Sequence, residues 1–467
     1  MLEALKHLAS TSAASASASA SNSATNPAGQ TELLKRFSDL QPPLNARQAA
    51  LESARCLYCY DAPCTRICPT EIDVPSFIQN IASGNLQGAA TGILQQNILG
   101  ASCSRVCPTE ILCEHACVRN HDSEAAPVRI GLLQRYALDH AEFTSHPFQR
   151  APATGKTIAI VGAGPAGLAC AHQLAMHGHE VVIYESQAKA GGLNEYGIAR
   201  YKLVQDTAQH EIEFLLGIGG IRILCNQTLG LQIHLSDLRR DYDAVFLAIG
   251  LGASRQLGLA EEDAPGMLAA VDYIAELRQS QDLLGLALPA QCVVIGAGNT
   301  AIDMAVQIAR LGAEQVTLVY RRGAQQMSAT AHEQSIARDH QVRIMTWQQP
   351  QQVLLNAQGQ VSGLRVVQTR EHAGRLIADG AITDIPAQAI FKAIGQTLDT
   401  QTFSDGDARD IHIEHDKIRV DVQYRTSLEG VYAGGDCIAA GLDLTVQAVQ
   451  HGKLAALAIH SDLNAKV

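Results

Sequence analysis

The sequence predicts an α/β fold: two Rossmann-like nucleotide-binding domains, one inserted in the other, preceded by an all-α domain that holds iron-sulfur clusters. Two observations predict the nucleotide domains. A glycine-rich turn between a strand and a helix occurs twice, and each copy is followed by a similar later strand. A third predicts the helical domain: eight of the twelve cysteines fall between Cys56 and Cys117.

Composition bounds the class of protein. The 467 residues suffice for about three domains at roughly 150 residues each. The 35 basic and 46 acidic residues give a formal net charge of −11, which disfavours nucleic acid as a partner. No apolar run approaches the ~18 to 20 residues that cross a bilayer. Without a secretory or transit signal, and with clustered cysteines that suit a reducing compartment, we expect a soluble, cytoplasmic protein with no membrane partner.

The expected domain boundaries follow from changes in pattern. The N-terminal Ala/Ser tract has too little branched apolar content to pack and predicts a disordered tail. A late strand near Gly430 completes the first nucleotide domain, so the second is inserted in it. The expected domains are the tail (1–30), a helical domain with two 4Fe-4S clusters (31–150), an FAD-binding domain (151–258 and 396–467) and an NAD(P)H-binding domain (259–395).

The helical domain is expected to consist of short pieces. Apolar residues recur at helical spacing over 31–37 and 77–94, and several prolines interrupt the region. Because little apolar material remains for an independent core, we expect metal centres to tie these helices together.

The first nucleotide domain begins with a complete strand, turn and helix. A strand over 157–161 leads into a turn in which Gly162 permits the tight bend, Gly164 lets the backbone approach a pyrophosphate, and Gly167 allows close packing of helix on strand. Pro165 and Ala166 complete this turn. The second strand, 180–185, ends in Glu185, which can accept hydrogen bonds from a ribose diol.

Further features favour FAD in this domain. The loop at Gly192 and Leu193 suits a larger ligand, and Gly250 ends the later strand. Asp436 could hold the ribityl chain, although it could also be an ordinary turn carboxylate. Backbone amides at Thr445, Val446 and Gln447 would place the start of a helix against the flavin.

The second copy favours NADPH over NADH. Its turn contains Gly296, Gly298, Asn299 and Thr300, and Ala301 stands where the first copy has its third glycine. Arg321 aligns with the acidic residue of the first copy and Arg322 follows it, so two guanidinium groups would attract a 2′-phosphate. The alternative is a solvated arginine pair at a strand end.

The cysteine spacings indicate two metal clusters. The eight residues are Cys56, Cys59, Cys64, Cys68, Cys103, Cys107, Cys113 and Cys117, and both Cys68 and Cys107 precede a proline. Soft ligands in two close groups suit iron-sulfur clusters or zinc. Zinc is disfavoured because nucleotide domains imply electron traffic, which zinc does not carry.

Other cysteines and histidines receive no role. The isolated cysteines are explained by buried packing, with an approach of Cys437 to the flavin as the minor alternative. The histidines lack metal-ligand spacing and are expected on helix or turn surfaces; these are His172, His177, His179 and His451.

Three segments carry a resemblance to a known family. They are 56–64 and 101–110 around the cysteines, and 191–197 after the first nucleotide turn. From about residue 40 to its C-terminus the chain resembles the FAD-binding small subunit of bacterial NAD(P)-dependent dihydropyrimidine dehydrogenase and the N-terminal half of the single-chain enzyme.

The resemblance implies a ligand set that differs from eight cysteines. One 4Fe-4S cluster would be held by Cys56, Cys59, Cys64 and Cys117. The other would be held by Cys68, Cys107, Cys113 and the side-chain amide of Gln134, which leaves Cys103 out. The loop before Gln134 is one residue longer here than in the family.

The implied function is electron input. A hydride from NAD(P)H would reduce FAD, and single electrons would pass through the two clusters to a larger partner that contains FMN and reduces uracil or thymine. No side-chain acid or base is needed for that transfer, so no catalytic residue is assigned.

Two alternatives remain. The first is the small subunit of NADPH-dependent glutamate synthase, or a related electron-transfer flavoprotein; that subunit has different cysteine spacings and a glutamate-like position where Gln134 stands. The second is a scaffold protein with zinc-stapled helices and degenerate nucleotide folds. The x3 and x5 cysteine spacings together with Gln134 favour the pyrimidine enzyme.

Overall fold

The computed structural model describes residues 27–121, 125–286, 289–404 and 406–465, which fall into two compact units. The larger unit comprises 41–195, 202–253 and the residues from Thr397 onward. The smaller unit comprises the residues through Leu40, 196–201 and 254–396. The chain therefore leaves the larger unit, forms the smaller one and returns, as an inserted domain does.

Short helices form the first part of the larger unit, as predicted, and the segment 77–94, with its apolar residues at helical spacing, belongs to two of them. Gly84 adopts a φ of +79° that ends the first, and the Asn85 side chain caps the second by accepting from the Gly88 amide at 3.0 Å. The helices are α3 (Ala46–Ser53), α4 (Pro63–Ile67), α5 (Val74–Ala82), α6 (Leu86–Gln96), α7 (Gly100–Val106) and α8 (Ile130–His140), with 3-10 turns η1 (Thr109–Ile111) and η2 (Val118–His121).

A five-stranded parallel sheet follows in the larger unit, in the order β17-β4-β1-β2-β3. Its strands are β1 (Thr157–Val161), β2 (Glu180–Tyr184), β3 (Ile221–Leu224), β4 (Ala244–Leu247) and β17 (Val431–Ala433). Ile158 and Ile160 are buried on one face and Ala159 on the other, because both faces of the sheet are covered.

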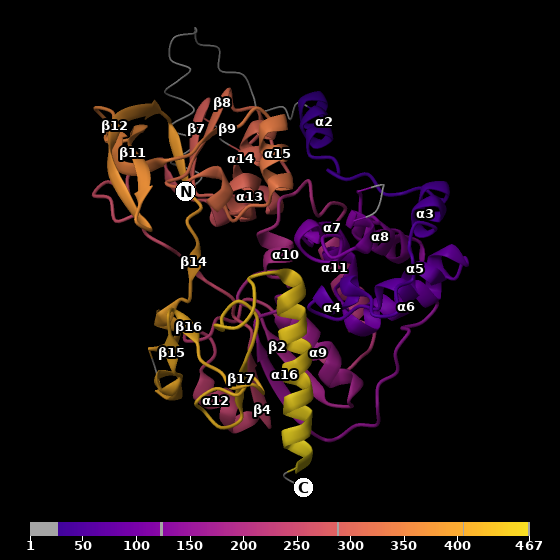
Figure 1. Ribbon diagram of the computed structural model, residues 1–467. Helices are drawn as coiled ribbons and strands as arrows, with labels where there is room; N and C mark the ends of the chain where they lie inside the picture. The colour runs from indigo at the N-terminus through magenta and orange to yellow at the C-terminus, as the bar shows by residue number, and fades with distance from the viewer. Residues whose placement is uncertain (1–26, 122–124, 287–288, 405, 466–467) are drawn as a thin grey trace. The chain divides into compact units, whose positions relative to one another are not determined.

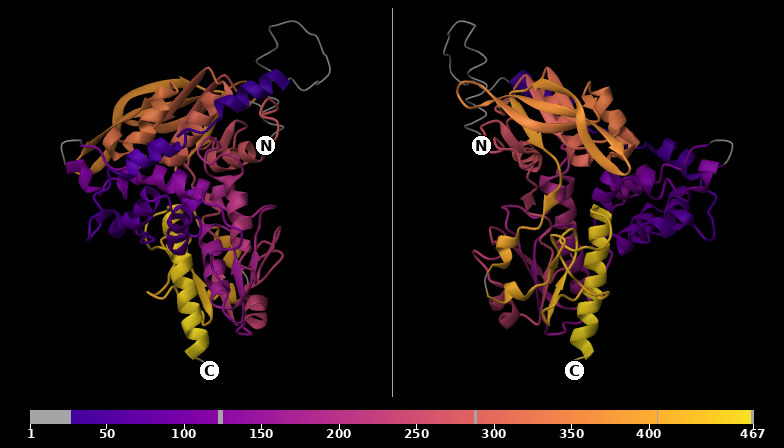
Figure 2. Two further views of the ribbon diagram at one scale, coloured as in Figure 1. Left: turned by 90° about the vertical axis from the view of Figure 1, so that its right-hand side faces the viewer. Right: turned by 60° about the vertical axis from the view of Figure 1, so that its left-hand side comes forward.

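Helices cover one face of that sheet. The helix α9 (Pro165–Met176) packs there, with the long α16 (Thr445–Ala465) beside it (Figures 1 and 2). The remaining elements of this unit are α11 (Thr207–Leu216), α12 (Leu235–Asp241), η4 (Thr400–Phe403), η5 (Gly406–Asp410), β15 (Ile413–Glu414) and β16 (Lys417–Ile418). The chain passes between the units in α10 (Leu193–Tyr196), β5 (Ala253–Ser254) and β14 (Gln396–Thr397).

The smaller unit repeats the architecture with a second parallel sheet, in the order β6-β13-β7-β8-β9. Its strands are β6 (Met267–Ala269), β7 (Gln291–Ile295), β8 (Gln315–Val319), β9 (Arg343–Met345) and β13 (Ala389–Lys392). Its helices are α2 (Pro27–Arg36), α13 (Ala270–Gln279), α14 (Asn299–Leu311) and α15 (Ala331–Asp339), with η3 (Ala324–Gln326).

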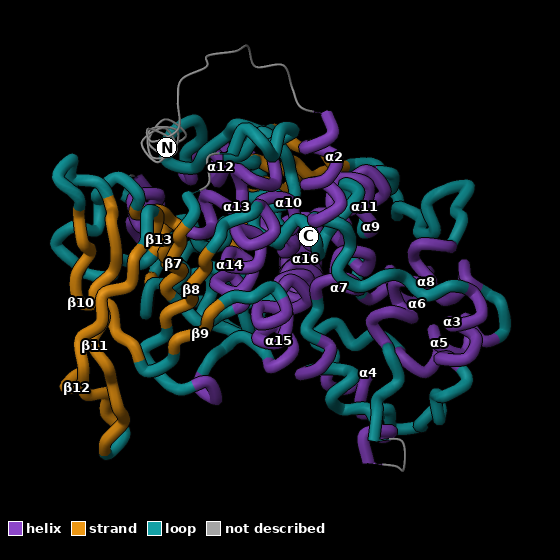
Figure 3. The backbone as a smooth tube through the Cα atoms, turned by 90° about the horizontal axis from the view of Figure 1, so that it is seen from above, coloured by secondary structure: helices purple, strands orange, loops and turns teal. Residues whose placement is uncertain are grey.

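An antiparallel sheet distinguishes this unit from the other. It consists of β10 (Gln348–Leu355), β11 (Val361–His372) and β12 (Arg375–Pro386), and Figure 3 shows it beside the parallel strands. Val353, Leu364 and Ile385 pack against Val293 and Val319 in a shared core. The predicted class is confirmed: two Rossmann-like sheets, one inserted, after a helical region. Among the described residues, no helix is both long enough and apolar enough to span a membrane.

Candidate functional site

The first glycine turn is built so that side chains cannot enter it. Gly162 has a φ of +100°, and a Cβ there would lie 2.3 Å from the carbonyl oxygen of Ala248. A Cβ on Gly167 would lie 2.0 Å from the carbonyl oxygen of Gly162. Gly164 stands at the N-cap of α9, with the Cα of Gly192 3.8 Å from its Cβ position. The turn therefore presents bare backbone at a helix start, which suits a pyrophosphate.

Glu185 follows β2 and lies against this turn. Its side chain is buried, and its Oε2 accepts a hydrogen bond from the Ala163 amide at 2.7 Å. The other oxygen accepts from the Gln187 amide at 2.7 Å and from the Ser186 hydroxyl at 3.2 Å. These donors fix the carboxylate beside the turn, where the predicted contact with a ribose diol requires it.

Asp436 lies after β17, which is next to β4 in the sheet. Among the described residues, none donates a hydrogen bond to its carboxylate. Burial raises the pKa of Asp436 to about 6, the Asp443 carboxylate adds to the rise, and Lys417 opposes it. A half-buried carboxylate without a donor fits the hydroxyl groups of a ribityl chain.

The start of α16 lies beside the loop that follows Gly192 and Leu193. The hydroxyl group of Thr445 donates to Asn194 Oδ1 at 3.2 Å. Val446 is buried. The Gln447 amide lies 3.0 Å from the His451 ring. Gly250, with a φ of +61°, follows β4. The predicted flavin residues of the glycine turn, the 192–193 loop and the α16 start thus lie in one unit, and they fit FAD.

The second turn has the same backbone and different side chains. A Cβ on Gly296 would lie 2.2 Å from the carbonyl oxygen of Ala393. Gly298 is the N-cap of α14, which begins at Asn299 and Thr300. The Oδ1 atom of Asn299 is buried and has no hydrogen-bond partner among the described residues. An unused acceptor at a helix start beside bare backbone fits a bound dinucleotide.

Arg321 and Arg322 follow β8 and are exposed. Their backbone carbonyls accept from the Thr369 hydroxyl at 2.7 Å and from the Trp347 amide at 3.0 Å. Within the described part of the chain, neither guanidinium group is hydrogen-bonded or ion-paired. Both are therefore available to an anionic group on the nucleotide.

The first group of thiols comprises Cys56 and Cys59 between α3 and α4, Cys64 in α4, and Cys117 just before η2. Burial raises the pKa of Cys56, and the Cys59 and Cys117 thiols add to the rise. Burial raises the pKa of Cys64 to about 11, again with Cys117 and Cys56 adding. These four thiols are therefore close enough to act on one another electrostatically.

The second group surrounds the end of α7. Burial raises the pKa of Cys107 and of Cys113 well above the ordinary value, and the Cys68 thiol contributes to both rises. Cys103 is also close to Cys107, but it is buried, with 3% of its surface exposed. Cys103 therefore differs from Cys68, Cys107 and Cys113 in its burial, because those three thiols are half-buried.

Gln134 of α8 is buried, and its Nε2 donates to the carbonyl of Gly100 at 3.1 Å. Its Oε1 accepts no hydrogen bond within the described residues, so it is the atom available to iron. No three His, Cys, Asp or Glu side chains in the described ranges are arranged around a single metal ion. A 4Fe-4S cluster spaces its ligands more widely, because each ligand binds a different iron atom.

The predicted surface position is wrong for three of the four histidines. His172, His179 and His451 are all buried. Burial lowers the pKa of His172 to about 3 and of His179 to about 4, with neighbouring histidines adding to both effects. His451 accepts a hydrogen bond from the Gly435 amide at 3.3 Å, next to Asp436. These residues carry no motif, so sequence reasoning had no signal for their surroundings.

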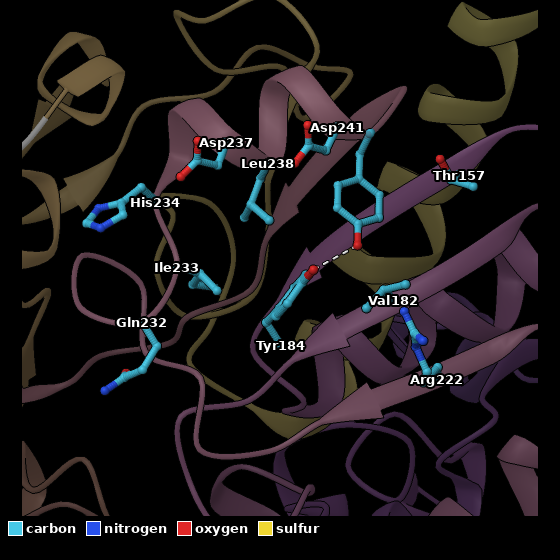
Figure 4. A pocket seen from close by; sticks show the side chains of 11 residues that line it. Thr157, Val182, Tyr184, Arg222, Gln232, Ile233, His234, Asp237, Leu238 and Asp241 are labelled. Carbon is cyan, nitrogen blue, oxygen red and sulfur yellow. Dashed lines mark hydrogen bonds between the residues drawn. The ribbon is translucent and has the colours of Figure 1, made fainter.

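A pocket of about 420 Å³ opens on the sheet of the larger unit (Figure 4). It lies between β1, β2, β3 and α12, and the hydroxyl groups of Tyr184 and Tyr242 meet there at 2.7 Å. None of the predicted site residues lines it.

Comparison with known proteins places the chain in a family. Residues 156–452 match the pyridine nucleotide-disulphide oxidoreductase model, and residues 33–145 match the model for dihydropyrimidine dehydrogenase domain II, a 4Fe-4S cluster domain. The chain therefore belongs to the pyridine nucleotide-disulphide oxidoreductase family. It is an oxidoreductase with an FAD- and NAD(P)-binding domain and a 4Fe-4S domain, and the predicted cofactor classes are confirmed.

Two relatives of known name match nearly the whole chain. The NAD-dependent dihydropyrimidine dehydrogenase subunit PreT of Escherichia coli (strain K12) is 35% identical over 426 residues, 91% of this chain and 96% of that protein. The glutamate synthase [NADPH] small chain of the same strain is 34% identical over 446 residues, 90% of this chain and 92% of that protein. The predicted family resemblance is confirmed.

A solved structure shows the same fold. FprA of Mycobacterium tuberculosis, in complex with NADPH, matches 68% of this chain and 86% of its own with a TM-score of 0.54 and 20% identity. At that identity the likeness concerns the fold alone.

Proposed function

We propose that this chain is the electron-input subunit of a dihydropyrimidine dehydrogenase. It takes electrons from NAD(P)H and delivers them through FAD and two 4Fe-4S clusters to an FMN-containing partner that reduces uracil or thymine. The observation that carries the proposal is the second group of thiols together with Gln134: its Nε2 donates to Gly100 at the start of α7, its Oε1 accepts no hydrogen bond among the described residues, and Cys103 is buried while the other three thiols are half-buried.

The residues divide the work between the units. In the larger unit the bare turn from Gly162, Glu185, Asp436 and the start of α16 would hold FAD, which converts a two-electron hydride transfer into single-electron transfers. In the smaller unit the turn from Gly296 would hold the nicotinamide nucleotide, and the exposed arginines after β8 would bind its 2′-phosphate.

The proposal includes a hetero-oligomer in the cytoplasm. A relative that covers 91% of this chain is named as a subunit, which supports a partner chain. All twelve cysteines are free thiols, and a reducing compartment keeps cluster ligands in that state. The isolated chain should therefore oxidise NAD(P)H with an artificial acceptor and leave uracil unchanged.

A small subunit of glutamate synthase is the second candidate, because the relative of that name is 34% identical over 90% of this chain. Co-purification of the partner, followed by assays with uracil and with glutamine plus 2-oxoglutarate, separates the two. Uracil-dependent NAD(P)H oxidation by the complex supports the proposal. Activity with glutamine and 2-oxoglutarate alone rejects it.

The ligand assignment makes a matched prediction. Gln134→Ala should remove or distort one cluster, because it deletes the proposed oxygen ligand. Cys103→Ala should leave the iron content unchanged, because Gln134 takes the place of that thiol in the proposed ligand set. Iron and acid-labile sulfide per FAD, measured with the electron paramagnetic resonance (EPR) spectrum of the reduced protein, check both. Loss of iron in Cys103→Ala would overturn the assignment.

A further inference from the structure

Lys453 of α16 contacts the helical region that carries the cysteines. Its half-buried ammonium group donates to the carbonyl of Gln96 at 3.1 Å, to Gln96 Oε1 at 3.0 Å and to the carbonyl of Thr70 at 3.4 Å. Gln96 ends α6, and Thr70 lies two residues after Cys68. One side chain of the long helix therefore holds both the end of α6 and the segment that leaves Cys68.

The hydrogen bonds of Lys453 go to neutral groups. All three acceptors are neutral oxygens, so none forms an ion pair with the ammonium group. Two groups act on it electrostatically, the Glu71 carboxylate and the Cys68 thiol. Cys68 in turn acts on Cys107 and Cys113. The geometry agrees, because the ammonium group donates to the Thr70 carbonyl at 3.4 Å and the Thr70 hydroxyl lies 3.4 Å from Cys68 Sγ, so Lys453 lies near this thiol of the second group.

A positive charge at that place affects electron entry. When one electron leaves reduced FAD and enters a cluster, the cluster becomes more negative by one charge and no bond is made or broken. A nearby ammonium group stabilises the more negative state, which raises the reduction potential of the cluster. Lys453 also lies six residues, about 1.7 helical turns, after Gln447 and in the first half of α16, at whose start the flavin is expected.

We propose that Lys453 is a positioning residue for electron entry: it fastens the Cys68–Thr70 segment to α16, and its charge raises the reduction potential of the cluster held by Cys68, Cys107, Cys113 and Gln134. The inference rests on the proposed function, since it requires a cluster at those ligands and a flavin at α16. It assigns a role to a residue that no motif marks.

Three substitutions separate charge from hydrogen bonding. Lys453→Met removes both, Lys453→Gln removes the charge and keeps a donor, and Lys453→Arg keeps the charge. Lys156→Met is the control, because Lys156 is a half-buried lysine that pairs with Asp243 just before β1, away from the cysteines. Reduction potentials of the two clusters are measured by EPR during anaerobic redox titration, with NADPH-driven flavin bleaching followed separately.

In the Met and Gln variants we expect the equilibrium constant for reducing one cluster to fall about tenfold, which is about 59 mV for a one-electron couple. The reduction potential of the other cluster should not change in these variants. In the Arg variant and in the control, both potentials should equal those of the wild type. If Lys453→Met prevents cluster assembly, the reduction potential of the Lys453→Gln variant alone tests the effect of the charge. Unchanged potentials in the neutral variants overturn the inference. A wild-type protein without two EPR-active clusters instead overturns the proposed function.

Discussion

The two nucleotide folds share one architecture and differ in what is attached to it. Both have five parallel strands in equivalent order and a glycine turn closed by the carbonyl of a neighbouring strand end, Ala248 in one and Ala393 in the other. The larger unit ends its second strand with a buried carboxylate and joins a cysteine-bearing helical region. The smaller ends it with exposed arginines and carries an antiparallel sheet.

The difference shows that the fold supplies the place and a few side chains supply the chemistry. The backbone of the turn accepts a pyrophosphate in either unit. On the proposed function, the charge at the strand end would select the ribose substituent, and the attached region would determine where electrons go next. Three predictions test how far each difference matters.

The largest effect is expected where the third position of the turn differs. Gly167→Ala would put a Cβ 2.0 Å from the carbonyl oxygen of Gly162, although Ala301 is accommodated at the equivalent position of the smaller unit. Because a backbone oxygen cannot rotate away, we expect about 3 kcal/mol of destabilisation and loss of most bound FAD. FAD content and thermal unfolding measure this.

The matched variant is Ala301→Gly, which should cost only about 1 kcal/mol through helix propensity. It should leave FAD content unchanged. Equal losses of stability in Gly167→Ala and Ala301→Gly would show that the two turns are packed alike at this position.

The second prediction concerns the contact, within the larger unit, between the cysteine-bearing helices and the nucleotide fold. The Glu211 carboxylate on α11 is buried and accepts from the Ala101 amide at 2.7 Å, from the Ser102 amide and from the Ser102 hydroxyl at the start of α7. Burial raises its pKa to about 7, while these donors and Arg105 oppose the rise. The folded state therefore binds this proton more tightly than the unfolded state does.

The sign follows from that difference. Between the unfolded pKa, about 4.3, and the folded pKa, the native state holds more protons, so this group's contribution to stability falls as the pH rises and is constant above about pH 7. The loss is at most about 4 kcal/mol. Denaturation of wild type and Glu211→Gln is measured from pH 5 to pH 8. The free energy of unfolding of the wild type, relative to that of the variant, should fall as the pH rises to about 7 and then stay constant. A difference independent of pH would contradict the prediction.

The smallest effect is expected at the strand end of the second fold. Arg321→Ser removes one guanidinium group from the proposed 2′-phosphate site, which should raise the KM for NADPH about tenfold and leave the KM for NADH nearly unchanged. Arg375→Ser, on the exposed β12, is the control. Equal changes for both coenzymes would show that Arg321 does not distinguish them.

Local patterns predicted both nucleotide folds, because glycine spacing and apolar runs report on strand, turn and helix within a few residues. The apolar spacing does not indicate the end of one helix and the start of the next around Gly84, because the spacing continues through that residue. The surroundings of Glu211 and Lys453 were beyond prediction for another reason: their partners are 109 and 357 residues away in the chain. Nothing in a helix sequence marks which buried charge will meet a distant carbonyl.

The central claim is that NADPH electrons reach two iron-sulfur clusters through a flavin in this chain. Anaerobically purified protein, titrated with NADPH and followed by visible and EPR spectroscopy with acid-labile sulfide analysis, tests it most directly. We expect flavin bands in the visible spectrum, acid-labile sulfide for two 4Fe-4S clusters, and EPR signals of the clusters that appear on reduction. A protein that contains flavin but no sulfide would contradict it.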